Sequence, residues 1–227
     1  MRLTAIFLGA AILLRAGGTD LDRARDTQDR PALERLAGEA VSGAQKLPSD
    51  AQAQYRAALA SSHLAEVAIE VGDKARARSA AESGIQAGQR AIGLNAQSAE
   101  FHRVLGTLCG QAVTSNPLSI LKYGHCAQDE INKAVELDPK SALNYVGRGI
   151  GNYYLPPAFG GGVDLAVKDL QRAVALDAKL AEAHLWLGIA LRKAGRTADA
   201  HAELQKAVDL APARVWAKEQ LAKTPGQ

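Results

Sequence analysis

The feature that most constrains this chain is the stretch Ala181–Pro212, whose pattern predicts two helices joined by a tight turn at Gly195. After the turn, Ala200, Leu204 and Ala207 follow one another at spacings of four and three residues. These spacings place two small side chains and one Leu on the same face of the second helix. Small residues on that face allow two antiparallel helices to approach closely. The stretch therefore predicts a helical hairpin.

The hairpin closely resembles a tetratricopeptide (TPR) repeat. The residues that carry this resemblance are Leu187, Gly188, Ala200, Leu204, Ala207 and the closing Pro212. His184 stands where the family usually has Trp, and we expect weaker packing there. The resemblance implies an all-α fold, a right-handed superhelix of stacked antiparallel helix hairpins. Its concave groove would be lined by the first helix of each hairpin.

The same second-helix pattern recurs upstream. Its positions are Ala166, Leu170 and Ala173 in one copy, Ala127, Ile131, Ala134 and Pro139 in another, and Gly84, Gly88 and Ala91 in a fainter one. We therefore expect a TPR domain over residues 50–227. It would contain a degenerate hairpin at 50–96, repeats at 99–139, 142–178 and 181–212, and a capping helix at 213–222. The composition agrees, because 47% hydrophobic but only 4% aromatic residues imply a core of Ala, Leu, Val and Ile.

Two repeats are interrupted by inserted segments. Residues 114–125 delay the second helix of the repeat 99–139, and residues 155–162 lengthen the turn of the next repeat. The second insertion contains Pro156, Pro157 and three consecutive glycines, which end one helix and free the backbone before the next. This layout is similar to that of TPR proteins related to the regulator-of-microtubule-dynamics family and to exported bacterial TPR proteins.

The N-terminal segment 1–18 has the pattern of a secretory signal peptide. An apolar run, Leu3–Leu14, follows one basic residue and precedes small residues at 16–18. We expect export to the periplasm or secretion, with no stable membrane insertion after cleavage. A retained anchor and a cytosolic protein are the alternatives, although the run is shorter than the about 20 apolar residues of a membrane span. Residues 19–49 are expected to form a charged, solvated lead-in and a short helix.

No enzymatic chemistry is expected from the motifs. The chain has no G-x-S-x-G, no H-E-x-x-H, no phosphate loop ending in Lys-Ser/Thr and no C-x-x-C pair. We therefore predict no enzyme and no cofactor. The formal charge of +3 is too small to indicate nucleic-acid binding, and the glycines at 160–162 are interpreted as a flexible turn.

The two cysteines, Cys109 and Cys126, have three interpretations. An even number in an exported chain favours a disulfide. They can equally be two buried thiols, because free Cys is a common small core residue. A zinc site with His102 and His125 is the third alternative, but the adjacency of His125 and Cys126 fits tetrahedral coordination poorly. We predict no metal.

Two functions of different classes are compatible with these patterns. The favoured one is a non-enzymatic scaffold whose groove holds a protein or peptide partner. The alternative is a small-molecule-binding or accessory enzyme role, in which segments 114–125 and 155–162 form a lid. The repeat alignment places the following residues in the groove: Arg103, Thr107, Gln111, Val146, Ile150, Tyr153, Tyr154, Leu185, Ile189, Arg192 and Lys193.

This groove would carry two Tyr rings, an apolar floor and a basic end at Arg192 and Lys193. Tyr and Arg often dominate binding energy. The basic end predicts a peptide ligand with an acidic group or a free carboxylate. The alternative is that Tyr153 and Tyr154 merely pack under the second insertion and that Arg192 and Lys193 form a solvated helix end.

Overall fold

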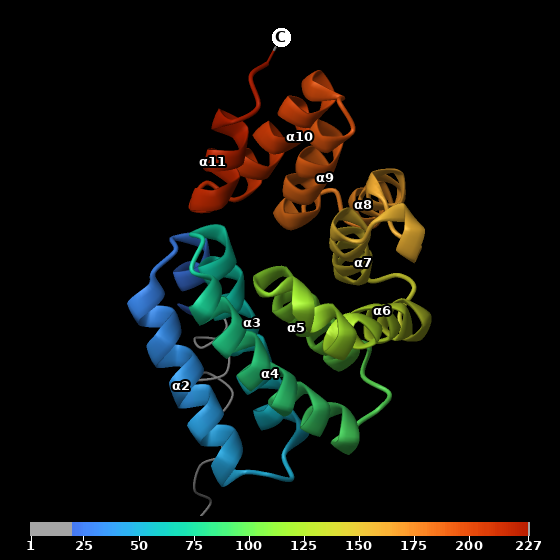
Figure 1. Cartoon of the computed structure of the whole chain (residues 1–227). Coiled ribbons are helices and arrows are strands. Elements are labelled where there is room, and N and C mark those ends of the chain that lie inside the picture. Colours follow the sequence, from blue (N-terminus) through green and yellow to red (C-terminus); the bar gives the residue numbers. More distant parts are fainter. Residues whose placement is uncertain (1–19, 227) are drawn as a thin grey trace, which may run out of the picture.

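A computed structural model describes residues 20–226, and this part of the chain is helical with no strand. The helices are α2 (Arg30–Lys46), α3 (Ala51–Glu70), α4 (Lys74–Leu94), α5 (Ala99–Ser115), α6 (Ile120–Leu137), α7 (Ala142–Tyr154), α8 (Val163–Leu176), α9 (Ala181–Lys193), α10 (Thr197–Leu210) and α11 (Val215–Ala222), with 3-10 turns η1 (Pro117–Ser119) and η2 (Pro157–Phe159). Helices α3 to α10 pair in chain order into hairpins that stack as a superhelix (Figure 1). The predicted all-α TPR superhelix is confirmed.

The hairpins close tightly because glycine occupies the same position in three first helices. A Cβ on Gly188 would lie 2.5 Å from Leu204 Cγ. The corresponding distances are 2.6 Å from Gly149 to Leu170 Cγ and 2.7 Å from Gly106 to Ile131 Cγ1. A side chain at any of these positions would push the two helices apart. The recurring glycine is therefore a packing requirement of the hairpin.

Capping side chains set where the N-terminal helices begin. Asp50 accepts hydrogen bonds from two backbone N–H groups at the start of α3, and Asp73 and Ser98 each accept one at the start of α4 and α5. Such caps satisfy donors that the helix itself leaves free. Gly72, with φ +79°, forms the left-handed turn between α3 and α4.

The predicted lead-in is wrong for its first part. Residues 20–26 are helical, and Leu21 and Ala24 are only 8% and 4% exposed. These two apolar side chains, three positions apart, lie on one helical face and join the core built by α2 to α5. The neighbouring charged residues remain at the surface or form ion pairs.

The signal-peptide prediction for residues 1–18 lies outside the described residues. Within residues 20–226, no helix is both long and apolar enough to cross a bilayer.

The superhelix curls so that its two ends meet. One hydrophobic core lies among α2 to α5 and a second among α7 to α11. In Figure 1 the C-terminal helices approach the end of α3. Arg214, which directly precedes α11, contacts Glu66 and Glu70 of α3. These contacts join the two ends of the superhelix at the concave side.

Candidate binding cavity on the concave face

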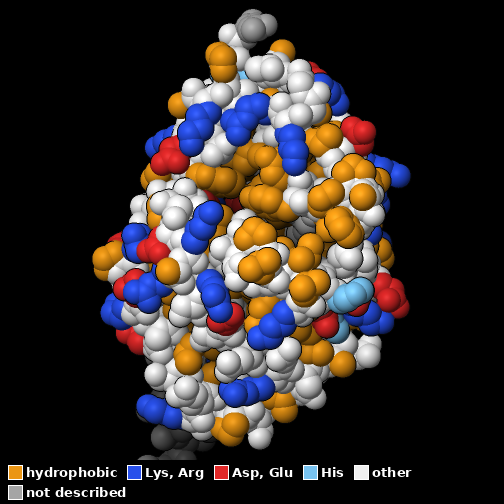
Figure 2. Space-filling view, viewed as in Figure 1, with side chains coloured by type: hydrophobic (Ala, Val, Ile, Leu, Met, Phe, Trp, Pro, Cys, Tyr) orange, Lys and Arg blue, Asp and Glu red, His pale blue; other side chains and the backbone are white. Residues whose placement is uncertain are grey.

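A cavity of about 700 Å³ lies on the concave side of the superhelix. It is lined mainly by α3, α5, α6 and α7, with two residues from α9. Apolar side chains form most of its wall, among them Leu59, Val104, Val113, Ile131, Val146 and Ile150. Figure 2 shows hydrophobic side chains gathered around a hollow in this region. A cavity of this size with a predominantly apolar wall is typical of a ligand site.

The structure places only part of the predicted groove on this cavity. The predicted residues that line it are Arg103, Thr107, Gln111, Val146, Ile150 and Tyr154. The predicted residues that do not line it are Tyr153, Leu185, Ile189, Arg192 and Lys193. The alignment therefore located the groove in α5 and α7 but not in α9.

Two of the four predicted groove residues of α9 are buried beneath other elements. Leu185 and Ile189 are 1% and 4% exposed and belong to the C-terminal core. The two residues of the predicted basic end do not line the cavity and have hydrogen-bond partners within the fold. Arg192 donates to the backbone oxygen of Gln220 at 3.2 Å and to Thr224 Oγ1 at 2.7 Å, so it fastens α11 and the C-terminal residues beyond that helix.

Lys193 also contacts another helix of the fold. Its Nζ donates to the backbone oxygen of Tyr153 at 2.8 Å and lies 4.2 Å from the centroid of the Tyr153 ring. The distance fits a cation–π contact. Lys193 therefore fastens the end of α9 to the end of α7 and does not face the cavity.

An aromatic wall was missed by the sequence interpretation. Trp186 and Trp216 line the cavity together with Tyr154. The ring centroids of Trp186 and Trp216 are 5.2 Å apart, and those of Tyr154 and Trp186 are 6.2 Å apart. The sequence could have indicated these two residues, because they are the only Trp residues in a chain with 4% aromatic residues.

The two inserted segments contribute to the same cavity. Thr114, Ile120 and Gly124 line it from the first insertion, and Leu155, Pro156 and Gly160 from the second. The first insertion forms η1 and the start of α6, whereas the second forms the turn around η2. Both inserted segments therefore border the cavity.

A polar end of the cavity contains residues from four different elements. Its charged lining residues are Asp22, Arg25, Glu66, Glu70, Glu100, Arg103 and Glu182. Arg103 Nε donates to Glu100 Oε2 at 2.8 Å, and the Tyr55 hydroxyl donates to Glu100 Oε1 at 2.7 Å. Burial and the neighbouring Glu100 raise the pKa of Tyr55.

Arg214 closes this end by joining the two ends of the superhelix. Its side chain is 2% exposed, and its Nη2 donates to Glu66 Oε1 at 2.6 Å and to Glu70 Oε1. Burial raises the pKa of Glu70 to about 7, and the charge of Glu66 adds to this effect. The hydrogen bonds from Arg214 and Gln28 oppose it only in part.

His63 lines the cavity beside these carboxylates. It is 8% exposed, and its Nδ1 is buried without a hydrogen-bond partner among residues 20–226. The Nδ1 atom lies 3.7 Å from Glu66 Oε2, and Nε2 lies 3.8 Å from Asp22 Oδ1. Burial lowers the pKa of His63 well below its usual value, with Arg25 contributing. The imidazole is therefore neutral at pH 7.

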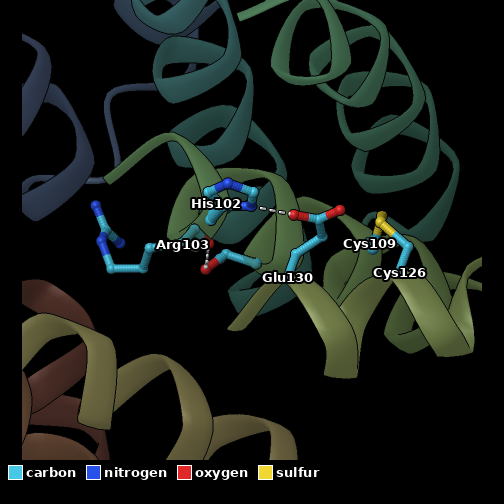
Figure 3. Close-up of a disulfide and its surroundings, with 6 residues drawn as sticks. His102, Arg103, Cys109, Cys126 and Glu130 are labelled. Atoms are coloured by element: carbon cyan, nitrogen blue, oxygen red, sulfur yellow. Dashed lines mark hydrogen bonds and ion pairs between the residues drawn. A yellow bond between two sulfur atoms is a disulfide. The ribbon is translucent and has the colours of Figure 1, made fainter. Parts of the chain in front are cut away.

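A disulfide joins Cys109 of α5 to Cys126 of α6, with a Cα–Cα distance of 5.9 Å. Figure 3 shows it on the same pair of helices as the contact between His102 and Glu130. His102 Nδ1 lies 2.5 Å from Glu130 Oε2. The zinc interpretation loses its ligands, because both sulfurs are bonded to each other. Within residues 20–226, no group of three or more His, Cys, Asp or Glu side chains is placed to hold a metal ion.

Helix hairpins that stack in chain order around a concave cavity are typical of TPR proteins. Residues 181–214 match the tetratricopeptide repeat family. Residues 20–154, more than half of the chain, match the family described as regulator of microtubule dynamics protein 1-3. The chain belongs to this family. No curated protein matches the sequence.

Solved structures share the fold at low sequence identity. A thermophilic TPR protein of Thermus thermophilus has 20% identity and a TM-score of 0.62, covering 94% of this chain and 97% of its own. The HusA haemophore of Porphyromonas gingivalis has 19% identity and a TM-score of 0.65, covering 84% of this chain and 96% of its own. These likenesses concern the fold, and the TPR scaffold supports a role in protein interaction.

Proposed function

We propose that this protein is a non-enzymatic binding scaffold that acts after export, in the periplasm or outside the cell. The observation that carries the binding role is the cavity of about 700 Å³ on the concave face, where TPR superhelices present an extended binding surface. The pattern of residues 1–18 supports export.

The occupant that we propose is an apolar peptide segment of a protein partner. The aliphatic and aromatic wall can accept its side chains. The polar lining residues Thr107, Thr114, Gln128, Asn132 and Asn152 can hydrogen-bond its backbone. An apolar peptide brings few charges into the site, and these polar side chains offer partners to backbone groups whose burial would otherwise be costly.

Two glycines on the wall allow a direct test. Gly110 and Gly151 line the cavity from α5 and α7, and a Cβ on either would meet nothing within 4 Å. Gly110→Leu and Gly151→Leu would therefore add side-chain volume at the cavity wall with no clash at Cβ. Gly38→Leu is the matched control, because Gly38 is also helical with open space around its Cβ but does not line the cavity.

The measurement is a screen of short apolar peptides by tryptophan fluorescence, since both Trp residues line the cavity. For the peptides that bind the natural protein, we expect both cavity-filling variants to weaken binding at least about tenfold and Gly38→Leu to leave it unchanged. If no peptide binds, or if the filled variants bind as well as the natural protein, the proposal is wrong.

A small molecule is the second candidate for the same cavity. Two observations favour it: the volume is in the range of drug-sized ligand pockets, and the inserted segments 114–125 and 155–162 border the space as a lid would. A haemophore is among the proteins of similar fold. The same titration with haemin in place of peptides tests this candidate, and saturable binding that Gly151→Leu abolishes would favour it.

A further inference from the structure

The polar end of the cavity has more acidic than basic groups. Its lining carboxylates are Asp22, Glu66, Glu70, Glu100 and Glu182, and its lining cations are Arg25 and Arg103. Arg214 and Asp26 contact these residues but do not line the cavity. His63 is neutral and adds no positive charge. The excess of carboxylates comes from the helix at residues 20–26 and from α3, α5 and α9. The fold therefore brings acidic residues together from distant parts of the sequence.

The hydrogen bonds leave specific carboxylate oxygens without donors. Arg103 is engaged by Glu100, and Arg214 is engaged by Glu66 Oε1 and by Glu70. Among residues 20–226, Glu66 Oε2 and Glu182 Oε2 accept no hydrogen bond, and the nearest cation to the latter is Arg214 Nε at 4.0 Å. These oxygens are thus available to a donor from outside the chain.

A second and independent observation points to a ligand at the same place. His63 is more than nine-tenths buried, lines the cavity, and has an unpartnered Nδ1 that lies 3.7 Å from Glu66 Oε2. A buried polar atom without a partner is costly in a folded protein. A donor placed between His63 and Glu66 would satisfy both atoms.

The wall next to these oxygens is aromatic. Trp186 Nε1 donates to Glu182 Oε1 at 2.9 Å, which fixes the carboxylate against the indole ring. Trp216 and Tyr154 stand beside Trp186. Aromatic ring faces attract cations, most strongly when the site is shielded from water. The guanidinium of Arg214 already lies over the Trp216 ring, 5.7 Å from its centroid. The carboxylates with free oxygens next to these rings form a site for a further positively charged group.

We infer that this end of the cavity binds the protonated amine of an otherwise apolar ligand. Its ammonium group contacts Glu182 Oε2, Glu66 Oε2 and His63 Nδ1, and its apolar body lies along the aromatic and aliphatic wall. This inference rests on the proposed function of the cavity as a binding site and names the chemistry of its ligand. The amine can belong to a peptide or to a small molecule, and the chemistry that recognises it is the same.

The test uses two matched pairs of probes on the full chain. The peptide pair is Leu-Leu-Phe-amide with a free N-terminal amine and its N-acetylated form. The small-molecule pair is 4-phenylbutylamine and 4-phenylbutanol. Tryptophan fluorescence reports binding. We expect the charged member of at least one pair to bind at least about tenfold tighter than its neutral partner, because hydrogen bonds to charged groups are stronger than neutral ones.

Glu182→Gln should remove this preference. Glutamine keeps the oxygen that accepts from Trp186 but has no negative charge. Glu136→Gln is the control, since Glu136 is 69% exposed and does not line the cavity. Melting temperatures verify that each variant folds, and Glu66→Gln replaces Glu182→Gln if the latter does not.

The outcomes separate the inference from the proposed function. Preference for the peptide amine or for the small amine identifies the source of the charged group. Equal binding of charged and neutral members, or a preference that survives in Glu182→Gln and Glu66→Gln alike, overturns the inference and leaves the scaffold function intact. Absence of binding by all four probes together with an empty peptide screen contradicts both.

Discussion

His102 and His184 occupy equivalent positions in two repeats and make the same contacts. Each is buried in a first helix, with Nδ1 2.5 Å from Glu130 or 2.6 Å from Glu203 on the second helix. In each, Nε2 lies 3.0 Å from a backbone oxygen of the preceding loop. At the position where the TPR family usually has Trp, this protein therefore replaces ring packing by a polar bridge between three segments.

We expect His184→Ala to lower the free energy of unfolding by about 2 to 3 kcal/mol, because it removes two hydrogen bonds and leaves a buried partner unsatisfied. Burial opposes ionisation of Glu203, but its hydrogen bonds from His184 and Lys206 keep the pKa of that carboxyl below its usual value. Urea unfolding measures the loss. His125→Ala, at an exposed position, should change little. Equal effects of the two variants would refute a structural role for the bridge.

The glycine in the hairpin is expected to be irreplaceable. Gly188→Ala would place a Cβ 2.5 Å from Leu204 Cγ and 3.0 Å from the backbone oxygen of Ala200. Overpacking of this kind costs about 1 to 3 kcal/mol. Gly38→Ala has open space around its Cβ and should stabilise α2 by roughly 0.5 to 1 kcal/mol through helix propensity. Thermal unfolding of both variants should therefore give shifts of opposite sign.

Reduction of the disulfide is expected to destabilise the protein by about 3 kcal/mol, since the bond closes a loop with a sequence separation of 17 residues. The measurement is urea unfolding with and without a reducing agent. A variant with Ala at both Cys109 and Cys126 is the control, because the reducing agent should have no effect on it. Unchanged stability of the natural protein on reduction would contradict the expectation.

Stability should increase when the pH falls from 8 to about 6.5. The pKa of Glu70 is about 7 in the folded protein and lies above its usual value, so the folded state binds more protons than the unfolded state in this window. Stability is thus gained below pH 7 and lost as the pH rises through it. The expected change is about 1 kcal/mol.

Glu70→Gln isolates this effect. In that variant the gain between pH 8 and 6.5 should disappear, as followed by urea unfolding at each pH. Below about pH 6.5 the opposite contribution of His63 begins, because its pKa is lowered in the folded state and the unfolded state binds the proton more readily. A gain of the same size in Glu70→Gln would show that another group is responsible.

The fold could be predicted because its determinants are local. Gly188, Leu204 and their counterparts recur at fixed spacings, and close helix approach requires small residues at those positions. The same periodicity placed Arg103 and Ile150 on the cavity. It failed in α9, because α11 packs against that helix and the capping contacts of Arg192 are not part of any repeat.

The charged end of the cavity could not be predicted. Arg214 and Glu70 are separated by 144 residues, and nothing in either local sequence indicates the partner. The pair forms only because the superhelix curvature returns its last helix to its first hairpin. The burial of Leu21 and Ala24 could not be predicted either, since two apolar residues in a charged segment are too few to indicate a buried helix.

The contact of Arg214 with α3 changes how this solenoid should unfold. In a linear array each repeat touches only its neighbours, so the terminal repeats fray first and independently. Here the segment before α11 is bonded to the first hairpin, and release of either terminus leaves buried charges unpaired. Fraying from one end therefore carries a penalty at the other. Amide hydrogen exchange at the two termini should consequently be coupled and slow, as in a closed ring whose first and last members open together.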